Sequence, residues 1–78
     1  MLESKIQSKI IKQYEAEGYF VLKIIKSNKN GIPDLLVCKN GEAFFVEVKS
    51  EKGCLSEIQK FRINELEKHG MKTLVKNE

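Results

Sequence analysis

The sequence has few of the residues that build disulfide frameworks, thiolate metal sites or membrane spans. Its 78 residues include two cysteines, one histidine, one proline and no tryptophan. Cys38 and Cys54 form no C-x-x-C pair and neither lies beside a histidine, so a zinc-binding pattern is absent. Both are expected to be structural thiols. No apolar run approaches the ~20 residues of a membrane span, and no signal-peptide core is found, so the expected location is the cytoplasm.

Composition predicts one globular domain over residues 1–78, with 41% hydrophobic and 32% charged residues. A chain this short buries only roughly 60% of its unfolded surface, which leaves room for an oligomer. The net charge is +3, and every basic residue except Arg62 is a lysine. Lysine suits contact with phosphate better than bidentate reading of bases, although lysine-rich surfaces are common in proteins of many functions.

Apolar periodicity and turn residues predict an α/β fold with the element order αβββαβ, a small mixed sheet packed with helices. Leu2, Ile6, Ile10 and Tyr14 recur at helical spacing in a segment that ends near Gly18. The second helix has Ser56 as its N-cap and Gly70 as its terminator. The expected elements are a helix within 2–18, a strand at 19–26, hairpin strands at 33–39 and 42–49, a helix within 56–70 and a strand at 71–76.

The Asn-Gly turn at positions 40–41 determines which hairpin residues face each other, because both residues accept the positive φ angles of a type I′ turn. Asp34 is then expected directly opposite Glu47, with Cβ atoms roughly 4.5–5.5 Å apart. Lys49 projects from the same face as Glu47. Opposed carboxylates repel unless a cation lies between them, one is protonated or both reach water. Because Mg²⁺ takes carboxylate oxygens as ligands, the pair is interpreted as part of a metal site. The opposite face is expected to carry Leu35, Val37, Phe44, Val46 and Val48.

Two polar helix residues are expected to point toward the sheet. Helix positions advance ~100° per residue, which places Glu3 and Gln59 within the apolar arcs of their helices. Each also has a structural interpretation. Glu3 suits the positive end of the helix dipole, and Gln59 is the N3 residue of a Ser56-x-x-Gln59 capping box.

The strand residues have structural interpretations as well. Asp34 after Pro33 suits a turn, and Glu47 with Lys49 suits an exposed ion pair on one face. His69 suits the last turn of its helix. An opposed acid pair, a lysine and two inward helix residues together nevertheless favour one shared site.

Three segments carry a resemblance to a known family. "GIPDLLV", "FFVEVKS" and "LSEIQKFRINEL" resemble the VRR-NUC (virus-type replication-repair nuclease) branch of the PD-(D/E)XK superfamily, and the likeness covers nearly the whole chain. The order αβββαβ is that superfamily's core. The length is similar to that of stand-alone phage members, which implies a host-cell cytoplasm if the chain is phage-encoded. Cys54 stands where a polar or basic residue is expected.

The resemblance implies a role for each site residue. The implied ligands of Mg²⁺, for which Mn²⁺ would substitute, are Asp34, Glu47, the backbone carbonyl of Val48 and Glu3. Lys49 matches the motif lysine, which would stabilise negative charge, and Gln59 matches the helical glutamine, which would orient water or phosphate. The implied protein is a metal-dependent, structure-selective DNA endonuclease that hydrolyses phosphodiester bonds in branched DNA.

Within that class, a homodimer resembling Holliday-junction resolvases is the preferred hypothesis, because two symmetric sites suit a symmetric junction. The alternatives are a monomeric flap nuclease, a non-catalytic DNA-binding module of the same fold, and a structural protein with surface ion pairs. No membrane partner and no nucleotide cofactor are expected. The candidate DNA contacts, chosen because they lie on or near the elements that carry the site, are Lys23, Lys26, Lys29, Lys52, Lys60 and Arg62.

Overall fold

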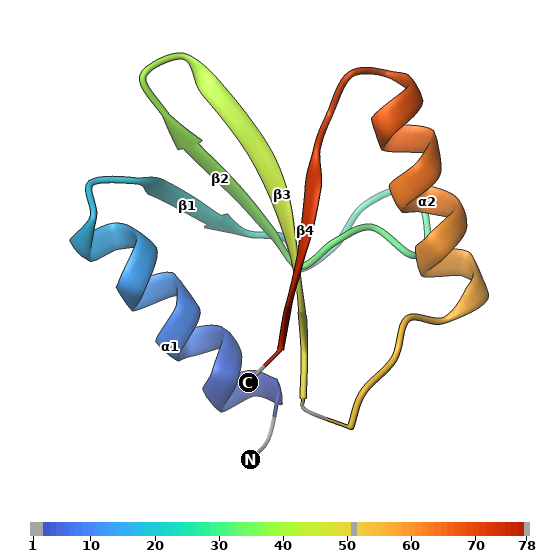
Figure 1. Cartoon of the computed structure of the whole chain (residues 1–78), viewed down its shortest axis with the longest axis horizontal. Coiled ribbons are helices and arrows are strands. Elements are labelled where there is room, and N and C mark those ends of the chain that lie inside the picture. Colours follow the sequence, from blue (N-terminus) through green and yellow to red (C-terminus); the bar gives the residue numbers. More distant parts are fainter. Residues whose placement is uncertain (1–2, 51, 78) are drawn as a thin grey trace.

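The computed structural model describes residues 3–50 and 52–77, and these form the predicted order αβββαβ (Figure 1). The elements are α1 (Glu3–Ala16), β1 (Phe20–Lys23), β2 (Leu35–Lys39), β3 (Glu42–Lys49), α2 (Glu57–Lys68) and β4 (Thr73–Asn77). No helix in the described ranges is both long and apolar enough to span a membrane. Leu2, which was expected to share the apolar face of the first helix, lies outside the described residues.

The helices end where the sequence predicts. Gly18, with φ of 90°, follows α1, and Gly70, with φ of 86°, follows α2. At the start of α2, the hydroxyl of Ser56 accepts the backbone N–H of Gln59 at 3.2 Å, and the Gln59 side-chain oxygen accepts the N–H of Ser56 at 2.9 Å. This reciprocal capping box satisfies donors that have no partner within the helix.

The four strands form one sheet in the order β1-β2-β3-β4. β1–β2 and β2–β3 are antiparallel, whereas β4 runs parallel to β3 and is reached through α2. Asn40 and Gly41 have φ of 52° and 82°, as a type I′ turn requires. The predicted register is confirmed, because Lys39 faces Glu42 and the same ladder continues to the other end of β2.

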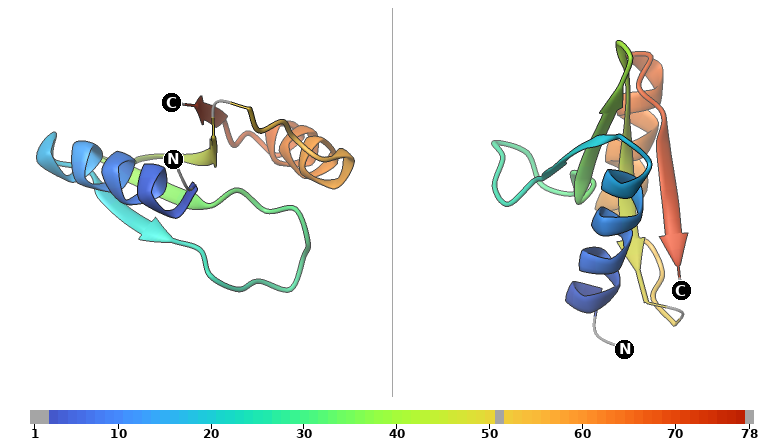
Figure 2. Two further views of the ribbon diagram at one scale, coloured as in Figure 1. Left: turned by 90° about the horizontal axis from the view of Figure 1, so that it is seen from below. Right: turned by 90° about the vertical axis from the view of Figure 1, so that its left-hand side faces the viewer.

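The core lies between α1 and one face of the sheet. Ile6 and Ile10 of α1 pack against strand side chains that are almost completely buried, Leu35, Val37, Val46 and Val48. Tyr14, Tyr19 and Phe44 close one end of this layer with edge-to-face ring contacts at 5.3–6.0 Å. The predicted apolar face of the hairpin is therefore confirmed. Figure 2 shows α2 on the other side of the sheet, so α1, the sheet and α2 make three layers.

The contact between α2 and the sheet buries fewer side chains than the contact between α1 and the sheet. No described residue of α2 is buried, and Ile58 and Phe61 are 43% and 55% exposed. Glu3 was expected to point inward, but it is exposed. It is the first residue of α1, and burial along this helix begins only at Ile6. Glu3 is therefore less buried than its position in the helical repeat suggested.

The first strand is shorter than the predicted 19–26. The last ladder bond runs from the N–H of Ile24 to the carbonyl of Asp34 at 2.8 Å. No further backbone hydrogen bond between these two strands is found among the described residues, so the pairing stops at Ile24, one position before Pro33 on the partner strand. The chain from 24 to 34 then loops away from the sheet toward α2 (Figures 1 and 2).

Candidate active site

Asp34 and Glu47 meet where the hairpin register predicts. The ladder pairs Leu35 with Val46, and its continuation places Asp34 opposite Glu47. One carboxylate oxygen of Asp34, Oδ2, accepts the backbone N–H of Val48 at 2.8 Å. Asp34 is thus held on β3 rather than left in a free turn, and Glu47 is only 2% exposed.

Two side-chain nitrogens approach the same carboxylate oxygen of Glu47. Its Oε2 accepts Nε2 of Gln59 at 3.2 Å and lies 3.4 Å from Nζ of Lys49. The Lys49 side chain is 12% exposed, so this is a mostly buried ion pair and not the solvated surface pair of the structural interpretation. Among the described residues, Oε1 of Glu47 and Oδ1 of Asp34 accept no hydrogen bond. Each acid therefore has one oxygen engaged by the protein and one available.

Burial raises the pKa of Glu47 from 4.5 to about 7. The loss of hydration on burial is the largest cause, and the negative charge of Asp34 is the next; the Lys49 ammonium opposes both. The charge of Glu3 also raises this pKa, so Glu3 acts on the site although it is exposed. A cation beside Glu47 would stabilise its charged form, which burial and the Asp34 charge destabilise.

The capping box determines the orientation of the Gln59 amide. Its oxygen accepts the N–H of Ser56, so its nitrogen must face Glu47. Gln59 consequently offers hydrogen-bond donors to the site and not an oxygen for a metal. The capping box and a role in the site were alternative interpretations of Gln59, and the geometry combines the two. Ser56 was missed as an orienting residue, although the Ser-x-x-Gln spacing was its signal.

The donor set fits a hard divalent cation. Two opposed carboxylates with one available oxygen each are ligands that Mg²⁺ accepts, with water and substrate phosphate completing its shell. A group of three or more acidic, histidine or cysteine side chains close enough to hold a metal does not occur within residues 3–50 and 52–77. The structure therefore brings Asp34 and Glu47 together but does not add Glu3 to them. The roles of Glu3 and of the Val48 carbonyl remain predictions.

The candidate DNA contacts lie in three different settings. Lys23 ends β1, Lys52 follows the end of β3, and both are exposed. Lys60 is exposed on α2, 3.8 Å from Glu57. Lys26 and Lys29 lie on the loop between β1 and β2.

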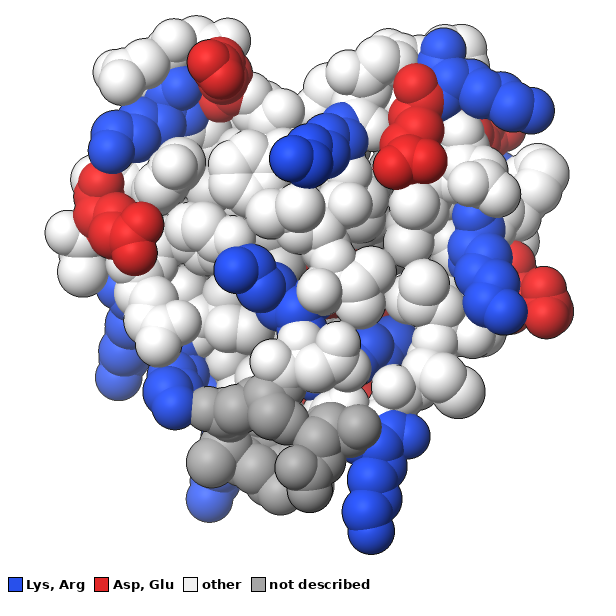
Figure 3. Space-filling view, viewed as in Figure 1, with Lys and Arg blue, Asp and Glu red and all other residues white. Residues whose placement is uncertain are grey.

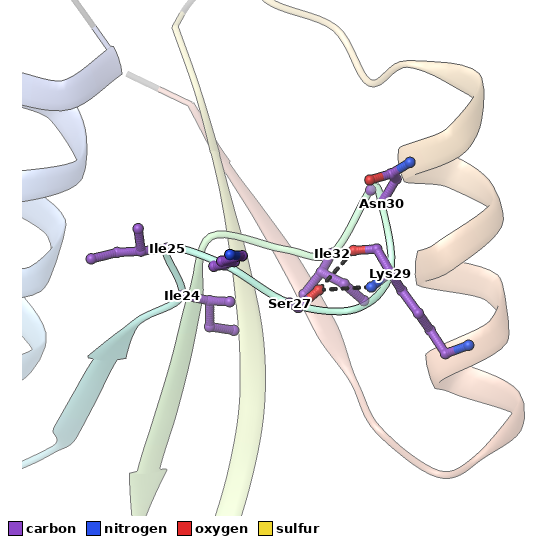
Figure 4. Close-up of a pocket in the computed structure, with 8 residues that line it drawn as sticks. Ile24, Ile25, Ser27, Lys29, Asn30 and Ile32 are labelled. Atoms are coloured by element: carbon purple, nitrogen blue, oxygen red, sulfur yellow. Dashed lines mark hydrogen bonds between the residues drawn. The ribbon is translucent and has the colours of Figure 1, made fainter.

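That loop forms a hollow of about 300 Å³, shown in Figure 4, where Ser27 and Lys29 are joined by hydrogen bonds. Arg62 differs from the lysines because its side chain is only 17% exposed. Its Nε donates to the carbonyl of Asn30 at 2.7 Å, and its Nη1 bonds Glu65 at 2.9 Å. Arg62 thus fastens the loop to α2.

The mixed four-stranded sheet between two helices, with an acid pair and a lysine on one face, defines a core of the PD-(D/E)XK type. The family model of the VRR-NUC domain matches residues 2–77. A solved structure described as "VRR_NUC domain" is 32% identical, superposes with a TM-score of 0.83, and is matched over 94% of this chain and 81% of that chain. A search of curated proteins found no match. The chain belongs to the VRR-NUC family, and it is a nuclease-type domain.

Proposed function

We propose that the protein is a Mg²⁺- or Mn²⁺-dependent endonuclease that hydrolyses phosphodiester bonds in branched DNA. The observation that carries this proposal is the convergence of four side chains on one partly buried face of the sheet. Asp34 and Glu47 each keep one carboxylate oxygen available, while Lys49 and Gln59 lie against the other oxygen of Glu47. A structural protein of this size gains nothing from burying an acid whose pKa is raised to about 7.

Asp34 and Glu47 would hold the metal, with the Val48 carbonyl and Glu3 as further candidate ligands. A bound divalent cation neutralises phosphate charge and lowers the pKa of a coordinated water. Lys49 would stabilise the negative charge that grows on the attacked phosphate, and its low exposure strengthens this interaction. Gln59 would donate its remaining N–H to water or to a phosphate oxygen, since the capping box prevents it from presenting its oxygen.

The proposed substrate is a junction, and the proposed active form is a homodimer. A four-way junction has two equivalent strands to cut, and a two-fold symmetric pair of sites matches it. The exposed lysines at 23, 26, 29, 52 and 60 would contact phosphates without reading sequence. Arg62 would act by holding the loop that carries Lys26 and Lys29.

The test is cleavage of end-labelled four-way junction, 5′-flap and linear duplex DNA in Mg²⁺ or Mn²⁺. The variant is Asp34→Asn, which keeps an oxygen for the Val48 N–H, and the control is Glu42→Gln at the exposed hairpin end. Paired symmetric nicks by wild type and Glu42→Gln, absent in Asp34→Asn, are expected. Undiminished cleavage by Asp34→Asn would refute the site. Selective cleavage of the flap by a monomer would favour the flap nuclease, and tight binding without cleavage the non-catalytic module.

A further inference from the structure

A polar groove runs between α1 and the edge strand β4, on the side of the sheet away from Gln59. Its hollow of about 270 Å³ is lined by Ile6, Lys9, Ile10, Gln13, Lys76 and Asn77. A smaller hollow of about 130 Å³ continues it toward the C-terminal end of α1, where Tyr14 and Glu17 line it. Within the described ranges no strand pairs with the outer side of β4, so this groove opens along an edge of the sheet.

Basic side chains border this groove. Lys9 and Lys76 lie on its two sides, and the described residues that line its larger hollow include no acid. Lys5 and Lys12 lie beside Lys9 on the same helix face. In Figure 3, basic side chains lie at both sides of the lower part of the visible face and also along its upper part, whereas the exposed acids lie in the upper part and at the two sides. The lysines that line and flank the groove therefore favour an anion there.

The groove reaches the border of the candidate active site. Asn77, which lines the groove, is the register partner of Lys49 on β3. Neighbouring strands lie roughly 4.8 Å apart, so one strand spacing separates the backbone of the groove from that of the motif lysine. The side chain of Asn77 also donates to the carbonyl of Ser50 at 3.2 Å, which holds the end of β3 against β4.

We propose that the groove between α1 and β4 holds the phosphate backbone of bound DNA where it continues past the β4 edge, on the opposite face of the sheet from the candidate active site. This inference rests on the proposed function and adds a binding surface to it. Beside the groove, at exposed positions of α1, Lys5 and Lys12 are separated by about 10 Å along the helix, and one DNA strand carries about three phosphates over that length. The spacing of the lysines thus suits a regular row of phosphates, and the Gln13 amide adds a neutral donor.

The test measures how affinity for a labelled four-way junction depends on salt. All proteins carry Asp34→Asn, so that binding is followed without cleavage. Lys9→Gln/Lys76→Gln removes two lysines from the groove, and Lys68→Gln/Lys72→Gln removes the same charge from the far end of α2 and the turn after it. Two lost phosphate contacts reduce the slope of log K against log salt by about 1.8. The far-end variant is expected to keep the parent slope.

Lys5→Gln/Lys12→Gln provides a second test on exposed positions of α1, with circular dichroism as the check on folding. The proposal would be overturned if Lys9→Gln/Lys76→Gln, which changes the lining of the groove itself, had the slope of the far-end variant. If that variant instead lost affinity for polyglutamate, the groove would be assigned to an acidic polypeptide. Failure of the parent protein to bind any DNA would refute the proposed function itself, and the groove proposal with it. DNA binding by the parent with an unchanged slope in Lys9→Gln/Lys76→Gln would refute the groove proposal alone.

Discussion

Replacing Glu47 by glutamine is expected to remove a pH-dependent loss of stability. Glu47 is the one charged side chain that the described part of the chain buries, and folding raises its pKa from 4.5 to about 7. The folded protein therefore binds this proton more tightly than the unfolded chain does. Stability from this group is fully present below pH 4.5 and is lost as the pH rises through 7.

The size of the effect follows from the shift in pKa. A shift to about 7 corresponds to about 3 kcal/mol at pH values well above 7. Because Glu47 is almost completely buried, solvent screening does not reduce this figure much. Between pH 5 and pH 8, the wild-type free energy of unfolding should fall by about 2 to 3 kcal/mol through this group. That is a large part of the stability available to a small domain.

Urea unfolding in EDTA at pH 5, 6, 7 and 8 measures the effect. With a slope of about 1 kcal/mol per molar urea for a small protein, the wild-type midpoint should fall by about 2 to 3 M across this range. Glu47→Gln should show little of this fall, because glutamine does not titrate. Glu57→Gln is the matched control, since the Glu57 side chain is 94% exposed and should leave the pH dependence unchanged.

Excess Mg²⁺ at pH 8 should restore stability to wild type and to Glu57→Gln but not to Glu47→Gln, because a cation beside Glu47 compensates for its buried charge. Equal pH dependence in Glu47→Gln and wild type would refute the reasoning. In that case another group would be responsible for the titration.

Three further outcomes are expected. Lys49→Met should lower the rate of cleavage about 10²- to 10³-fold in steady-state assays while calorimetry still detects Mg²⁺ binding, because Lys49 is paired with Glu47 but is not a ligand. Gln59→Glu should keep the capping box and the helix signal but place a second carboxylate against Glu47, and the lost donor should slow cleavage about 10- to 100-fold. Gly31→Ala should lower the free energy of unfolding more than Gly70→Ala: both glycines have φ near 80°, but only at Gly31 would a Cβ lie 2.7 Å from a backbone oxygen. Urea unfolding of the two glycine variants measures that difference.

Much of the fold could be predicted because its signals are local. The Asn40-Gly41 turn allows one register, and that register separates the apolar face of the hairpin from the face that carries Glu47. Strand β1 was predicted too long because its end depends on its partner. The apolar residues of 19–26 continue, but pairing stops at Ile24. The burial of Glu3 was misjudged for a similar reason, since periodicity gives a direction on the helix and not how far the sheet extends beneath it.

The candidate site was predictable where strand geometry determines it. Asp34, Glu47 and Lys49 follow from pairing and alternation alone, and the structure places them together. The direction of the Gln59 amide was not predictable, because it depends on a hydrogen bond that gives one side chain two partners. The contact of Arg62 with Asn30 was also hidden, since it joins residues 32 positions apart that share no sequence pattern.

The parallel pairing of β3 with β4 has a consequence for the order of assembly. The β2–β3 hairpin has short-range contacts and closes quickly, whereas β4 must wait for the long crossover through α2. In a chain synthesised from its N-terminus, Asp34 and Glu47 are therefore expected to meet before α2 delivers the Gln59 amide. The two carboxylates then face water, which solvates them cheaply. Glu47 is enclosed when α2 and the last strand dock. The free-energy cost of removing its carboxylate from water is therefore expected in the final step of folding.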